Sequence, residues 1–79
     1  MNKPTKRTYF KDEALLIKIG NKIREIRQSR NISQEKLANE CGIDYSQVHR
    51  MEMGKVNFSV SFLSKLSAAL EVEITDFLS

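Results

Sequence analysis

The chain has very little cysteine and no long hydrophobic run, and each shortage excludes a class of protein. Its single cysteine, Cys41, cannot form an internal disulfide, which is typical of a protein in a reducing cytoplasm. One cysteine and one histidine are too few for a zinc site, so we expect no metal and no cofactor. No apolar run approaches the roughly 18 residues that a membrane span needs. The sequence therefore predicts a cytoplasmic protein that does not enter a membrane.

Strand-like alternation, internal repeats and low-complexity segments are also missing from the sequence. No serine–histidine–carboxylate grouping stands at a recognisable spacing, and there is no glycine-rich phosphate loop. We therefore expect that the chain is not an enzyme, and no small-molecule effector is evident. A length of 79 residues with 41% hydrophobic content is typical of one folded domain and too short for two.

Basic residues are concentrated in the first part of the chain. Residues 1–30 carry nine of the thirteen Lys and Arg against three acidic residues, whereas residues 31–79 carry four basic and seven acidic side chains. This asymmetry indicates that only part of the surface meets a polyanion. The alternative is a solvated surface of mixed charge, and a pI of 9.2 does not decide between the two.

Hydrophobic spacing predicts an all-α fold, a compact domain of four or five helices over residues 12–79. Residues 1–11 lack this spacing and are expected to form a flexible basic arm. Asp12 is a predicted N-cap for the first helix, which Asn31 ends as a residue that tolerates a left-handed backbone. The apolar residues of this helix repeat at helical intervals: Leu16, Ile19, Ile23 and Ile26.

Similar start and stop residues delimit the later helices. Ser33 is expected to cap the second helix and Gly42 to end it, because glycine adopts a positive φ without a Cβ clash. Asp44 and Gln47 resemble a capping box at the start of a third helix, 45–53. Ser59 is expected to cap the fourth helix. Thr75 and Asp76 would open a short fifth helix that returns Phe77 and Leu78 to the core.

Residues Gln34 to Met53 read as a helix-turn-helix. Ala38 allows two steeply crossing helices to approach, and Gly42 provides the turn between them. The third helix can lie in a DNA major groove and present its polar side chains to base edges. A helical hairpin in another bundle is the alternative. Apolar residues would face the core: Leu37, Cys41, Ile43, Val48 and Met51.

The segment from Ile19 to Leu78 resembles the Cro and phage-repressor helix-turn-helix family, which has a lambda-repressor-like fold. The resemblance is clearest in the segments IREIR, SQEKLA and AALEV, in the Gly42 turn and in Glu52-x-Gly54. Length and arrangement are also similar to restriction–modification controller proteins and small prophage repressors. Three positions depart from the family pattern: Asn31 replaces a glycine, Phe58 a frequent proline, and Met53 an often polar residue.

The resemblance implies a role for each matching position. Gln34 matches a glutamine that holds a phosphate and braces the recognition helix, and Arg27 and Glu52 match a buried ion pair. Lys55 and Asn57 fall in the loop that grips phosphates. Tyr45, Ser46 and Arg50 match positions that commonly contact bases, and Gln47 and His49 are neighbours within reach of the backbone or a base. For these the alternatives stay open: Arg50 on a phosphate or in solvent, Tyr45 in helix packing and His49 in solvent.

The sequence as a whole predicts a homodimeric transcriptional regulator of double-stranded DNA that binds a pseudo-palindromic operator. The alternative is an antitoxin or a protein-interaction adaptor that uses the same fold. For the basic arm, DNA wrapping and a solvated tail both stay open. The dimer candidates are apolar residues beyond those that the helical stripes require: Phe58, Val60, Ile74, Phe77 and Leu78, with Leu15 and Ile17 as alternatives.

Overall fold

The computed structural model describes residues 11–79, so the arm expected over residues 1–11 lies, except for Lys11, outside the described residues. Within that range the chain forms helices and no strand, which confirms the predicted all-α class. None of the described helices is long and apolar enough to cross a membrane. The elements are α1 (Glu13–Ser29), α2 (Gln34–Cys41), α3 (Tyr45–Glu52), α4 (Val60–Leu70) and a 3₁₀-helix, η1 (Ile74–Leu78).

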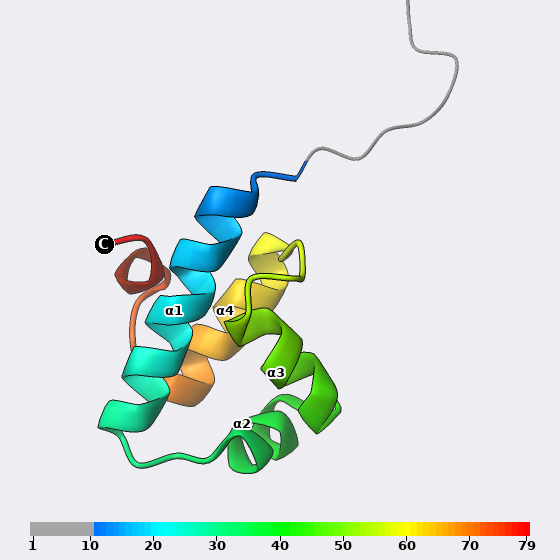
Figure 1. The fold of residues 1–79 in the computed structure, drawn as a ribbon. Coiled ribbons are helices and arrows are strands. Elements are labelled where there is room, and N and C mark those ends of the chain that lie inside the picture. Colours follow the sequence, from blue (N-terminus) through cyan, green and yellow to red (C-terminus); the bar gives the residue numbers. More distant parts are fainter. Residues whose placement is uncertain (1–10) are drawn as a thin grey trace, which may run out of the picture.

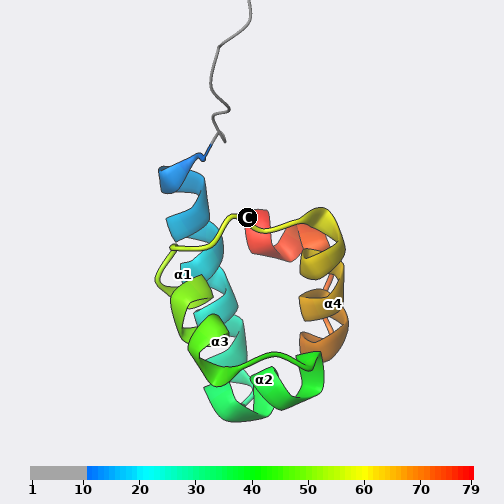
Figure 2. The ribbon, with the colours of Figure 1, turned by 90° about the vertical axis from the view of Figure 1, so that its right-hand side faces the viewer.

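The helices pack around one common core (Figures 1 and 2). Helix α2 lies at the end of the molecule opposite to the N-terminus of α1 and packs against both α3 and α4. Helix α3 also packs along α1, and η1 closes the other end by contacting α1 and α4. This arrangement holds α3 between two other helices while its outer side stays uncovered.

Three of the predicted N-caps are present. The side chains of Asp12, Ser33 and Ser59 each accept a hydrogen bond from the backbone N–H three residues later, at 3.0–3.1 Å. The predicted capping box at the start of α3 is wrong, because the Gln47 N–H donates to the backbone carbonyl of Asp44 and not to its side chain. A capping box forms instead at η1, between Glu73 and Asp76.

The turns between helices use left-handed backbone positions. Asn31 and Gly42 have φ values of 56° and 68°, which confirms both predicted helix stops, and Gly54 has 76°. Glu71 also adopts a positive φ of 60° after α4, and its sequence context gave no reason to expect this. Each of these four residues lies in the connection that follows a helix.

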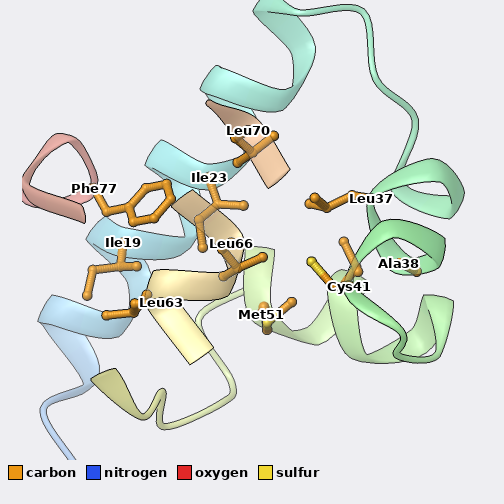
Figure 3. Packing of buried hydrophobic residues seen from close by; sticks show 11 residues of the cluster. Ile19, Ile23, Leu37, Ala38, Cys41, Met51, Leu63, Leu66, Leu70 and Phe77 are labelled. Atoms are coloured by element: carbon orange, nitrogen blue, oxygen red, sulfur yellow. The ribbon is translucent and has the colours of Figure 1, made fainter. Parts of the chain in front are cut away.

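The core combines side chains from every helix (Figure 3). Phe77 of η1 is fully buried beside α1, which confirms its predicted return to the core. Leu78 instead remains 45% exposed, so the prediction was wrong for this residue. Cys41 is buried, as expected for a small apolar side chain. The central cluster comprises Ile19, Ile23, Leu37, Ala38, Cys41, Val48, Met51, Leu63, Leu66, Leu70 and Phe77.

Candidate nucleic-acid interface

The turn between α2 and α3 fixes the direction in which α3 leaves the core. Gly42 reverses the chain, and the N–H of Ile43 donates to the carbonyl of Ala38 at 3.0 Å. Ala38 itself is buried in the core, and α2 and α3 pack directly against each other. Two residues of α3, Val48 and Met51, then anchor it in the core. The orientation of α3 is therefore set by buried contacts on one side only.

The other side of α3 is a row of exposed polar side chains. Tyr45, the first residue of α3, is 52% exposed. Within residues 11–79 no group of three or more His, Cys, Asp or Glu side chains is placed to hold a metal ion. The row offers hydrogen-bond donors and acceptors. It consists of Tyr45, Ser46, Gln47, His49 and Arg50.

The last residue of α3, Glu52, is buried and ties three helices together. Its carboxylate accepts hydrogen bonds from Arg27 of α1, at 2.6 Å from Nε to Oε2 and 3.0 Å from Nη2 to Oε1. The amide nitrogen of Gln34, first in α2, donates to the same Oε1 at 2.9 Å. A buried carboxylate requires a neutralising charge. Arg27 supplies that charge together with two directional hydrogen bonds.

Two of these contacts go beyond the pairing that the sequence predicted. Arg27 also donates from Nη1 to the carbonyl of Ile32 at 2.8 Å, which fixes the turn between α1 and α2. The bond from Gln34 to Glu52 gives the expected bracing role a specific partner. Glutamine at a helix start gives no sequence indication of its tertiary partner, so this contact could only come from the fold.

Gly20 is a positioning residue that the sequence reasoning missed. A Cβ at this position would lie 2.4 Å from the backbone oxygen of Met51 and 2.9 Å from that of Glu52. The backbone of α1 therefore touches the C-terminal end of α3 directly. A glycine inside a helical stripe is the only indication that sequence offers for such an approach.

The loop after α3 brings two expected phosphate-contacting residues to the surface. Lys55 and Asn57 are both exposed, and the N–H of Lys55 donates to the carbonyl of Arg50 at 3.0 Å. This bond joins the loop to the exposed row of α3. Met53, which directly follows α3, is exposed and apolar, so no phosphate contact is expected from its side chain.

The predicted dimer residues differ widely in their exposure to solvent. Val60, the first residue of α4, is 74% exposed, and Leu78 is 45% exposed. Phe58 and Ile74 are half-buried and pack against the core. Phe77 leaves the set, because it is fully buried within its own chain and cannot reach a partner. The alternatives, Leu15 and Ile17, are exposed on α1.

Comparison with known proteins gives consistent matches to DNA-binding regulators. The model of a helix-turn-helix family matches residues 23–77. The control protein C.BamHI of Bacillus amyloliquefaciens is 43% identical over 60 residues, which cover 75% of this chain and 74% of that protein. The crystal structure of the restriction–modification controller protein C.AhdI from Aeromonas hydrophila has a TM-score of 0.77 at 39% identity, covering 81% of this chain and 97% of that one. SinR, a master regulator for biofilm formation solved in complex with DNA, has a TM-score of 0.71 at 32% identity, covering 77% and 98%.

Proposed function

This chain belongs to the helix-turn-helix family, and we propose from that premise that it binds a pseudo-palindromic operator as a homodimer. The family consists of DNA-binding transcriptional regulators and not of enzymes. In the proposal, α3 of each subunit enters one major groove, and the two half-sites lie about one helical turn apart. Regulation of a restriction–modification system is the setting that the two controller proteins suggest.

The exposed polar row on α3 is the observation that carries the proposal. A helix that is buried on one side and polar on the other fits a major groove, whose base edges differ in donors and acceptors. Arg50 is the proposed principal base reader, because a guanidinium pairs bidentately with guanine O6 and N7. Tyr45 and Ser46 stand at the start of α3, where recognition helices contact bases, and Gln47 and His49 extend the row.

Gln34 is proposed to couple a phosphate contact to the position of α3. A glutamine amide nitrogen has two hydrogens, and only one is engaged by Glu52. The other can donate to a phosphate oxygen, so one side chain would link the DNA backbone to the end of the recognition helix. Lys55 and Asn57 would contact the phosphates on the far side of the groove. Such contacts set register, while the α3 row supplies sequence discrimination.

Dimerisation is supported by exposed apolar side chains at the N-terminus of α4 and on η1. An exposed valine such as Val60 adds nothing to the subunit core, whereas a partner's matching surface would cover it together with Leu78. A closed pair with two-fold symmetry matches a pseudo-palindromic site and doubles the number of base contacts.

Selection of bound sequences from a random DNA pool tests the proposed function. We expect enrichment of one motif with two inverted half-sites whose centres lie about 34–36 Å apart along the duplex. Enrichment of no motif would contradict sequence-specific binding. Enrichment of a single, unrepeated half-site would contradict the dimer while leaving the role of α3 intact.

A further inference from the structure

A hollow beside α3 has no charged side chain in its lining. It lies between α3, the loop 53–59 and the start of α4, and it is partly open to solvent. Its apolar walls belong to the core or pack against it, so the fold fixes their positions: Ile43, Met51, Val56, Phe58 and Phe62. A phosphate finds no counter-charge in this lining, whereas an apolar group would displace water from it.

Three uncharged polar residues complete the lining of the hollow: Gln47, Asn57 and Ser59. Of the five residues in the exposed row on α3, Gln47 alone lines it. Gln47 stands four residues before Met51, so the two side chains lie on the same edge of the helix. Asn57 belongs to the loop that is proposed to contact phosphates, and Ser59 caps α4. The hollow therefore adjoins both the base-reading and the phosphate-contacting parts of the proposed interface.

The major groove of unmodified DNA presents one apolar group, the C5-methyl of thymine, next to the hydrogen-bonding edge of its partner adenine. A glutamine amide can bond bidentately to N6 and N7 of adenine. Because Gln47 and the apolar walls line the same hollow, one A·T pair can meet both. A small ligand is a poorer occupant, since such ligands usually bury most of their surface in a more enclosed pocket.

We propose that Gln47 and this hollow read one A·T pair in each half-site, with adenine on the Gln47 amide and the thymine methyl against the apolar walls. This inference rests on the proposed function, and it adds to Arg50 a second base reader whose base is specified. Burial of one methyl group should tighten binding by about fourfold. The gain involves no charge, so it should be the same at low and high salt.

Chemically modified operators test the inference on the parent protein. Each thymine of the selected operator is replaced in turn by uracil, which lacks the C5-methyl but pairs with adenine in the same way. We expect one position in each half-site at which uracil weakens binding by about fourfold. Replacing that pair by 5-methylcytosine·guanine keeps the methyl and removes the adenine, which should weaken binding by about 5- to 150-fold. Gln47→Ala should bind thymine·adenine and 5-methylcytosine·guanine equally at this position, while discrimination at the other positions is retained.

A variant of the apolar wall tests where the methyl lies. Val56→Ala removes two methyl groups from the wall, so the preference for thymine over uracil should fall toward equal binding. The matched control is Val72→Ala, because Val72 is also half-buried against the core but does not line the hollow. The control should keep the about fourfold preference of the parent. The uracil scan needs no variant, so the inference stays testable if Val56→Ala does not fold.

A parent that binds its operator specifically but is insensitive to uracil at every position would overturn the inference and leave the proposed function standing. A thymine preference that survives both Gln47→Ala and Val56→Ala would also overturn it, because the methyl would then lie elsewhere. If Val56→Ala kept the thymine preference but converted a dimer to a monomer in sedimentation, the occupant of the hollow would be a second copy of the chain. A parent that selects no motif would overturn both the inference and the proposed function.

Discussion

Glu52 accepts hydrogen bonds from two side chains on two other helices while it is nearly inaccessible to solvent. Removing Arg27 leaves this carboxylate buried without its counter-charge. Arg27→Ala should therefore lower the free energy of unfolding by about 3–5 kcal/mol, a large share of the about 5–15 kcal/mol that holds a typical domain folded. Chemical denaturation measures the loss, with Arg30→Ala as the exposed control.

A double variant keeps this prediction testable if Arg27→Ala does not fold. Replacing both charges, in Arg27→Met/Glu52→Leu, removes the buried carboxylate together with its partner. We expect the double variant to be more stable than either single variant. A cost for Arg27→Ala as small as that of Arg30→Ala would show that the buried pair does not stabilise the fold.

Cys41 links stability to pH in a defined direction. Burial raises the pKa of the Cys41 thiol above its ordinary value of 9.0, Glu40 raises it further, and Lys65 opposes the shift. In the unfolded chain the thiol ionises first, so the folded state is progressively disfavoured as pH rises above about 9. The stability difference between the parent and Cys41→Ala should shrink from pH 7 to 10. A constant difference across that range would contradict the account.

Gly20 shows how one position determines the packing of two helices. Alanine normally stabilises a helix interior by about 1 kcal/mol relative to glycine. At Gly20 the added Cβ would meet the backbone oxygens of Met51 and Glu52, so α1 and α3 must separate. We expect Gly20→Ala to destabilise the protein by about 1–3 kcal/mol and to weaken operator binding. Gln28 is exposed on the same helix, so the control Gln28→Ala should leave the free energy of unfolding nearly unchanged. A Gly20→Ala variant more stable than the parent would contradict the close approach of α1 and α3.

The sequence predicted the helices well because their determinants are local. Apolar spacing placed α1 and α4, and the caps Ser33 and Ser59 act on backbone groups three residues away. The features that local patterns do not reveal depend on residues far apart in the chain. The resemblance implied that Gln34 braces α3, but its partner Glu52 is identified only once the helices pack, and the close approach of α3 to Gly20 was missed altogether.

The candidate site likewise has features that the local sequence predicts and features that depend on the tertiary packing. The exposed row on α3 follows from its helical period, so Tyr45 and Arg50 lie in solvent as the pattern indicates. Phe77 could not be separated from the dimer candidates in advance, because an apolar residue near the end of a chain has the same pattern whether it fills its own core or a partner's surface. Only the packing of η1 against α1 and α4 distinguishes the two.

At the scale of the whole molecule, the proposed dimer can be tested by a substitution at Val60. Its exposed side chain contributes little to the folded subunit, so Val60→Asp should change the stability of the monomer by less than about 0.5 kcal/mol. A charge buried in the dimer interface should instead weaken association strongly. Sedimentation equilibrium should show a dimer for the parent and for the control Asn39→Asp, and mainly monomer for Val60→Asp. A parent that is monomeric at high micromolar concentration would contradict the proposed dimer.

In the proposed complex, α3 reads bases while the loop that follows it binds phosphates. Arg50→Ala and Lys55→Ala should be compared with the parent on the selected operator, on its single-base variants and on random DNA. Arg50→Ala should lose discrimination at one operator position, worth about 1–3 kcal/mol, whereas Lys55→Ala should weaken all sequences alike and lower the salt slope by about one. If both variants matched the parent on every DNA, α3 would not be the recognition helix.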